Sequence, residues 1–209
     1  MTSKTKKLLT AAENGDPEAQ WNLATMYFIG KGVPKDVDRA GILCRKSAEQ
    51  DHPEAQFFLG CMYGLGLIDG GPEDKVQAAD WFLKSAVQGY PDAQHNMGVM
   101  YYHGKGVTQD KAKAALWFQK SAEQGTPTAQ FNLAVMYAKG EGVPEDKVQA
   151  ADWIQKSAEQ GEPRSQYNLG LMYYHGEGVP QSFAQAALLF QKSAKTWAAI
   201  DGLEMPNLN

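Results

Sequence analysis

An internal period of 36 residues runs through almost the whole chain and restricts its fold more than any other feature. The pair Ala-Gln marks this period, beginning at Ala19, Ala55, Ala93 and Ala129 and, as a Ser-Gln variant, at Ser165. The spacings between these pairs are 36, 38, 36 and 36 residues. A chain repeated in this way is expected to fold as a solenoid, in which each unit buries its apolar face against its neighbours.

The period divides the chain into five repeats with a short segment at each end. We expect a capping half-repeat at residues 1–15, because Ala11-Ala12-Glu13-Asn14-Gly15 imitates the end of a repeat. The repeats follow at 16–51, 52–89, 90–125, 126–161 and 162–197, and a C-terminal cap or tail at 198–209 completes a single domain. The second repeat is two residues longer than the others, with its insertion in residues 67–71.

Each repeat is predicted to hold two helices separated by a glycine loop. The first helix begins with a proline such as Pro17, which suits a position where a backbone N–H would have no helical partner. Paired glycines, as in Gly30-Lys31-Gly32, then supply the positive φ of a tight helix exit. The N-cap candidates for the second helix are Asp36, Asp74, Asp110, Asp146 and Ser182.

Apolar spacing predicts which faces of these helices are buried. In the first helix, Ala19, Leu23 and Met26 recur at i, i+4 and i+7, which defines one buried stripe. The second helix carries a large apolar pair in the middle repeats, including Trp117-Phe118 and Trp153-Ile154. We expect Trp117 and Trp153 to lie on the buried face of that helix.

The recurring motif is Ala-Gln-x-x-Leu-Gly-x-Met-Tyr-x-x-Gly-x-Gly-Val, followed by Ala-x-x-Trp-x-x-Lys-Ser-Ala-x-Gln-Gly. It resembles the Sel-one-like repeat, a relative of the tetratricopeptide repeat, over about residues 16–197. The resemblance implies an all-α fold, a right-handed α-solenoid of antiparallel helix hairpins. It also implies a non-enzymatic adaptor, often bacterial, whose concave face binds a peptide or a partner protein.

A second apolar stripe is the candidate binding surface. Trp21, Thr25 and Phe28 lie about 200° around the first helix from the buried stripe, at 100° per residue. In tetratricopeptide-like superhelices, the corresponding positions line the concave wall. The candidate partner-binding residues are Trp21, Phe28, Phe57, His95, Tyr102, Phe131, Tyr167 and Tyr174. The alternative is that these side chains pack neighbouring first helices together.

Polar positions beside this stripe leave two questions open. Asn22, Asn96, Asn132 and Asn168 form a column whose amides could bond a ligand backbone or tie adjacent helices together. Lysine and arginine are absent from the inner columns apart from Arg164 and Lys139, so acidic C-terminal tails are expected to be poor ligands.

Several function classes are disfavoured. Twenty Lys and Arg against 24 Asp and Glu give a net charge of −4, which does not favour nucleic acid. No apolar run approaches the roughly 20 residues needed to enter a membrane.

We expect the protein to bind no metal and no cofactor. His95, His103 and His175 are too far apart to share one metal ion. Nucleophile-elbow, Walker and dinucleotide motifs are missing, which leaves a β-lactamase-like hydrolase or a structural spacer as alternatives to the adaptor.

The two cysteines, Cys44 and Cys61, favour a reducing compartment. We expect a cytoplasmic protein, or a periplasmic one if a leader has been removed. The helices that carry Cys44 and Cys61 should be neighbours, so a disulfide between the two residues is conceivable, but a buried free thiol is the commoner case.

Overall fold

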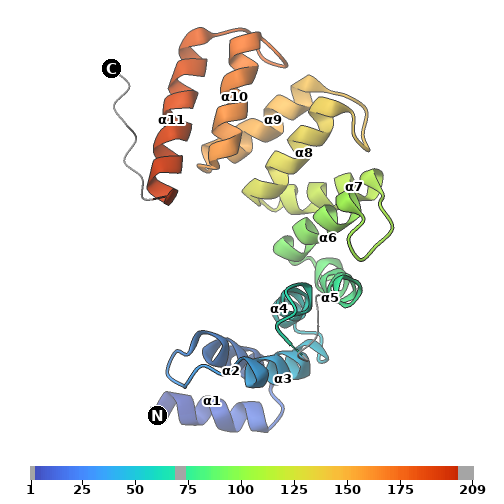
Figure 1. Cartoon of the computed structure of the whole chain (residues 1–209), viewed down its shortest axis with the longest axis vertical. Helices are drawn as coiled ribbons and strands as arrows, with labels where there is room; N and C mark the ends of the chain where they lie inside the picture. The colour runs from blue at the N-terminus through green and yellow to red at the C-terminus, as the bar shows by residue number, and fades with distance from the viewer. Residues whose placement is uncertain (1–2, 69–73, 202–209) are drawn as a thin grey trace. The chain divides into compact units, whose positions relative to one another are not determined.

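The computed structural model describes residues 3–68 and 74–201, and over these ranges it holds eleven α-helices and no strand (Figure 1). The helices are α1 (Ser3–Glu13), α2 (Pro17–Ile29), α3 (Val37–Ala48), α4 (Pro53–Gly64), α5 (Lys75–Val87), α6 (Pro91–His103), α7 (Lys111–Glu123), α8 (Pro127–Lys139), α9 (Lys147–Glu159), α10 (Pro163–His175) and α11 (Phe183–Asp201). Residues 202–209 of the expected tail and 69–71 of the expected insertion lie outside the described residues.

The chain divides into two compact units, Met1–Gln109 and Asp110–Asn209. Each helix from α1 to α6 packs against the next one in the first unit, and each helix from α7 to α11 does so in the second. We call α2, α4, α6, α8 and α10 the first helices of the repeats, and α3, α5, α7, α9 and α11 the second helices. This consecutive packing confirms the predicted all-α array of helix hairpins. That the repeats form one domain stays a prediction.

The helix ends follow the local sequence. All five first helices begin with the predicted proline, and Asp16 caps α2 by accepting a hydrogen bond from the Ala19 N–H at 2.7 Å. The carboxylate of Asp146 accepts bonds from the N–H groups of Val148 and Gln149 at the start of α9. These bonds stabilise the charged form and hold the pKa of Asp146 below its usual range. The other predicted N-caps, Asp36, Asp74, Asp110 and Ser182, also accept backbone bonds.

In the last three repeats, the second glycine of the loop rests on the preceding hairpin. Gly142 has φ of 74°, and a Cβ there would lie against the carbonyl group of Lys111 at the start of α7. Gly178 is placed in the same way on Lys147, and Gly106 on Lys75. Each of these loops therefore ties its repeat to the repeat before it.

The Ala-Gln signature is explained by a buried hydrogen-bond ladder. Gln130 donates from Nε2 to the Ala122 carbonyl at 3.1 Å and accepts a bond from Gln160 at 2.8 Å. Ser157 donates to the Pro127 carbonyl at 2.8 Å within the same hairpin. The amide-to-carbonyl bond between repeats recurs at Gln20–Ala12, Gln56–Ala48, Gln94–Ala86 and Gln166–Ala158. Each of these alanine carbonyl groups also accepts a backbone bond, as the Ala122 carbonyl does from the Gly125 N–H, so the glutamine adds a second bond that joins neighbouring repeats.

The expectation that the second-helix tryptophans lie on the buried face is wrong in detail. Trp117 and Trp153 are half-buried, and the ammonium groups of Lys120 and Lys156 lie 4.5 and 4.1 Å from their ring centroids. The adjacent residue fills the core instead, with Ile154 only 3% exposed. Trp153 packs against the edge of that core cluster. The aliphatic stem and charge of the lysine cover the rest of the indole.

Within a hairpin, a glycine of the first helix makes room for a large side chain of the second helix. A Cβ on Gly60 would approach the Phe82 ring to 2.8 Å, and one on Gly170 would approach the Phe190 ring to 2.6 Å. Both members of each pair belong to one repeat. In two other repeats, the first helix has alanine in place of this glycine, and the second helix has a residue smaller than phenylalanine. These pairs are Ala24 with Cys44 and Ala134 with Ile154.

Candidate functional site

The predicted partner-binding residues all lie on first helices, but their exposure differs. Trp21, Phe28, Phe57, His95, Tyr102 and Phe131 are half-buried. Tyr167 and Tyr174, both on α10, are 50% and 48% exposed. The column is therefore most open in the last repeat.

In the first compact unit, the aromatic column packs between successive first helices. The Trp21 ring lies 6.1 Å from His52, the N-cap of α4, and 5.4 Å from Phe58. The Phe57 ring lies 5.2 Å from Tyr90, the N-cap of α6. These contacts show that the packing role considered for the column applies to Trp21 and Phe57.

In the second compact unit, one ring of the column is covered by a cation. The Arg164 guanidinium lies 4.5 Å from the Phe131 ring centroid, and its Nε lies 2.6 Å from a Glu162 carboxylate oxygen. Tyr167 contacts Phe190 at 5.4 Å and Tyr174 contacts Phe183 at 5.4 Å, which fixes both rings on one side. Tyr167 and Tyr174 are thus each packed against a phenylalanine of α11 and still half open to solvent.

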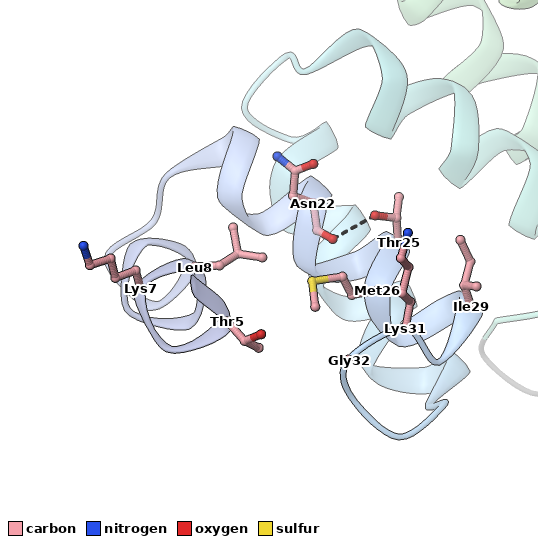
Figure 2. A pocket seen from close by; sticks show the side chains of 9 residues that line it. All are labelled: Thr5, Lys7, Leu8, Asn22, Thr25, Met26, Ile29, Lys31 and Gly32. Atoms are coloured by element: carbon pink, nitrogen blue, oxygen red, sulfur yellow. Dashed lines mark hydrogen bonds between the residues drawn. The ribbon is translucent and has the colours of Figure 1, made fainter. Parts of the chain in front are cut away.

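A groove lies between α1 and α2 and has a volume of about 900 Å³. In Figure 2, Leu8 of α1 and Met26 of α2 face one another across it, and Thr25 donates to the Asn22 carbonyl at 2.8 Å. Lys31, in the glycine loop, also lines this groove. Its walls therefore combine apolar side chains with a loop cation.

The same groove recurs at equivalent repeat positions. One of about 390 Å³ lies between α5 and α6, and one of about 240 Å³ lies between α9 and α10. Each groove takes an asparagine and a methionine from the first helix, and one residue from the glycine loop. These equivalent residues are Asn22, Asn96 and Asn168, then Met26, Met100 and Met172, then Lys31, Lys105 and Glu177.

The loop residue decides the charge of each groove. In the second compact unit, Lys147 pairs with Glu177 at 3.5 Å, and Lys111 pairs with Glu141 at 3.1 Å. In the groove between α5 and α6, lysines occupy both equivalent positions, Lys75 and Lys105. The glycine loops and second helices thus supply lysines to the grooves in addition to the first-helix cations Arg164 and Lys139.

Two of the asparagines bond within their own helix. Asn22 donates to Glu18 at 2.8 Å, and Asn168 donates to the Arg164 carbonyl at 2.8 Å. Neither bond ties adjacent helices together. Because each side-chain oxygen is not engaged by these bonds, the ligand-binding role considered for the column stays open at both positions.

No group of three or more His, Cys, Asp or Glu in residues 3–68 and 74–201 could hold a metal ion. Within those same ranges, no helix has the length and apolar character needed to cross a bilayer.

Both cysteines are free thiols in the structure. Burial raises the pKa of Cys44 to about 12 and the pKa of Cys61 to about 11. Since the thiolate is the reactive form, we expect iodoacetamide at pH 8 to label Cys44 far more slowly in the native protein than in denaturant. Mass spectrometry of timed samples measures this, and equal rates in the two conditions would contradict the burial of Cys44.

Known proteins that match this chain share its repeats. A family model described as "Sel1 repeat" matches residues 17–52, 53–90, 91–126, 127–162 and 163–195. A protective antigen of uropathogenic Escherichia coli strains, whose crystal structure displays an SLR fold, is 39% identical with a TM-score of 0.86. The match covers 92% of this chain and 41% of that chain.

Two further relatives differ in how much of their length is matched. The crystal structure of a Sel1 repeat protein from Oxalobacter formigenes is 28% identical, with a TM-score of 0.83, over 92% of this chain and 84% of that one. A Neisseria meningitidis serogroup B protein described as uncharacterised is 39% identical over 71 residues, which is 34% of this chain and 14% of that protein. The chain thus spans less than half the length of the Escherichia and Neisseria proteins.

Proposed function

Because the chain belongs to the Sel1 repeat family, we propose that it is a non-enzymatic interaction module that binds a peptide or partner protein along its first helices. The observation that carries this proposal is the pair of half-exposed rings on α10, Tyr167 and Tyr174. Proteins of this family bind other proteins, and the first helices line the concave face in related superhelices. The proposed partner-binding residues remain Trp21, Phe28, Phe57, His95, Tyr102, Phe131, Tyr167 and Tyr174.

Rigid aromatic side chains are well suited to this role. A ring that is already fixed loses little conformational freedom on binding and still buries a large apolar area. Phe190 and Phe183 support Tyr167 and Tyr174 from the same hairpin, which supplies that rigidity. The half-buried members, such as Trp21 and Phe57, would both hold successive first helices and present one edge to the partner.

We further propose that the protein acts in the cytoplasm. Two free thiols, one buried and one half-buried, suit a reducing compartment, where disulfides are rare. The adaptor role requires no bound metal or cofactor, and we propose none.

Replacement of the exposed rings tests the binding role. We expect Tyr167→Ala and Tyr174→Ala each to weaken binding of a peptide selected from a random display library by about 1–3 kcal/mol. Fluorescence anisotropy gives the affinity, and urea titration of the same variants gives the free energy of unfolding, which should change less than the affinity does.

Leu188→Ala is the matched control. Leu188 is a similarly exposed apolar residue, at 46%, but lies on α11 outside the aromatic column. Its removal should leave peptide affinity unchanged. Equal losses for Leu188→Ala and Tyr167→Ala would contradict a binding role for the column.

A further inference from the structure

The capping helix α1 occupies the place of a second helix. Gln20 donates to the Ala12 carbonyl of α1 at 3.2 Å, which is the bond that joins a first helix to the second helix before it at the four later junctions. Counting four residues back from that alanine makes Leu8 equivalent to Ile154 of α9. Helix α1 is thus a second helix for which the described residues hold no first helix.

A complete repeat closes this kind of groove on a third side. Ala134, Val135 and Ala138 of α8 line the groove between α9 and α10, which has a volume of about 240 Å³. Gly64 of α4 lines the groove between α5 and α6, which has a volume of about 390 Å³. The described residues that line the groove between α1 and α2 belong to those two helices and the glycine loop after α2, and its volume is about 900 Å³ (Figure 2). The groove is therefore wide where a first helix would otherwise lie.

Apolar side chains are exposed along this wide groove. Leu8 is half-buried, whereas its equivalents in complete repeats, Phe82 and Ile154, are 7% and 3% exposed. Ile29, at the end of α2, lines the groove and is 69% exposed, and the groove between α9 and α10 has His175 at that position. Covering these apolar side chains removes their area from water, which stabilises whatever covers them.

The charged side chains that line this groove are lysines. They are Lys7 and Lys31, and neither pairs with a carboxylate of the described residues. In the groove between α9 and α10, the loop position of Lys31 holds Glu177, which pairs with Lys147 at 3.5 Å. The groove between α1 and α2 thus carries a positive charge that favours an acidic occupant.

We propose that the groove between α1 and α2 is a docking site for an amphipathic α-helix of a partner protein. The docked helix takes the place that a first helix holds in a complete repeat, packs small side chains on Leu8 and Met26, and brings an acidic residue to Lys31. This site goes beyond the proposed function, because the aromatic residues of α2 face the other way. Their rings contact Phe58 of α4, at 5.4 Å from Trp21 and 4.9 Å from Phe28.

Helix α8 shows the pattern that the docked helix needs. Ala134 and Ala138 are four residues apart, and helical residues at this spacing share one face. Ala138, one residue before the end of α8, lines the closed groove together with Glu177, so that helix end lies near the loop. Because Lys31 holds this loop position in the wide groove, we expect small residues at i and i+4 of the docked helix and an acidic residue directly after the second.

The probe is a fluorescent peptide with the α8 sequence, residues 127–139, carrying Lys139→Glu. A hydrocarbon link on the face away from its alanines keeps it helical, since so short a helix is marginal in water. Fluorescence anisotropy with the full chain gives the affinity. We expect Ile29→Glu to weaken binding roughly tenfold, because it places a carboxylate against an apolar helix face.

A charge swap tests the contact with Lys31. Lys31→Glu should weaken binding of the acidic peptide roughly three- to tenfold, the range of an exposed ion pair replaced by repulsion. The peptide that keeps Lys139 should show the opposite preference and bind Lys31→Glu more tightly than the native chain. Glutamate already occupies this loop position at Glu141 and Glu177, so the variant is expected to fold, and circular dichroism verifies it.

Ile42→Glu is the matched control. Ile42 is 58% exposed and lies on α3, outside this groove. Its replacement should leave the affinity for the peptide unchanged. On the peptide side, Met136→Pro interrupts the helix and should abolish binding.

Four results would overturn this inference. The native chain may fail to bind the peptide, or Ile29→Glu and Ile42→Glu may bind it equally well, and either result excludes the groove as its docking site. Equal binding of the Met136→Pro peptide would exclude a helical occupant. A native chain that sediments as a dimer, and as a monomer after Ile29→Glu, would make a second copy the occupant. The proposed function is tested separately, by Tyr167→Ala and Tyr174→Ala.

Discussion

Replacing Gly142 with alanine is expected to lower the free energy of unfolding by about 3–5 kcal/mol, through strain and overpacking together. Gly142 has φ of 74°, a conformation that alanine adopts at a cost. The added Cβ would also meet backbone atoms at the start of α7, including the Ala112 nitrogen at 2.8 Å. Backbone atoms cannot swing aside as a side chain can, so the loop would lose its contact with the preceding hairpin. Urea titration followed by circular dichroism measures the change.

Gly125→Ala is the matched control for this prediction. Gly125 also has a positive φ, 93°, but a Cβ there would meet nothing within 4 Å. The expected cost is about 1–2 kcal/mol, from the conformation alone. If the two alanine variants were equally stable, the contact between Gly142 and α7 would not contribute to the fold.

Ile154→Ala is expected to lower the free energy of unfolding by about 2–5 kcal/mol. Ile154 is almost fully buried and packs in one cluster with Leu169 and Leu189 from the two following helices. Truncation therefore leaves a cavity where α9 meets α8, α10 and α11, and neighbouring helices can collapse into it only in part. Denaturant titration of the full chain gives the change, with the slope checked for a single transition.

Trp153→Ala provides the comparison that tests the orientation of α9. Trp153 lies at the edge of the same cluster with Lys156 over its ring, so its loss should cost about 1–3 kcal/mol. A larger loss for Trp153→Ala than for Ile154→Ala would restore the view that the tryptophans face the core.

Most of the hairpin fold could be predicted from the sequence. Proline at the first helical position, Asp at the N-cap and glycine at the exit are local signals, and each acts on its own backbone. The helix bounds follow from them, as α8 shows by beginning at Pro127 and ending at Lys139 before Gly140, which has φ of 64°. The fivefold repetition then predicted that each repeat packs against the next one in sequence, because equivalent residues form the contact surface of every repeat.

The orientation of the second helix was harder to predict, because adjacent residues lie only about 100° apart on a helix. Trp153 and Ile154 are both large and apolar, and hydrophobicity alone does not rank them. A signal was present in Lys156, three residues after Trp153, at a spacing that places an ammonium group over the indole ring. The same Trp-x-x-Lys spacing occurs at Trp81 and Trp117.

The grooves could not be found by comparing positions along the first helices. Each one is formed by a second helix, or by the capping helix α1, together with the first helix and glycine loop that follow it. Lys75 and Lys105 lie 30 positions apart and belong to different repeats, so their shared groove depends on how hairpins pack. The aromatic column was visible because it lies on one face of one kind of helix.

The matched pairs Gly60–Phe82 and Gly170–Phe190 determine where this array can be cut and rejoined. Each large residue and the glycine that makes room for it lie within one repeat, whereas the bonds between repeats join a glutamine to a backbone carbonyl at every junction. Chimeras with crossovers at repeat boundaries keep both features. A crossover inside a hairpin that joins the first helix of an alanine repeat to the second helix of a phenylalanine repeat places the alanine against the phenylalanine ring. Recombination among such genes would thus exchange whole repeats, and the number and order of repeats can change while the interior of each one is inherited intact.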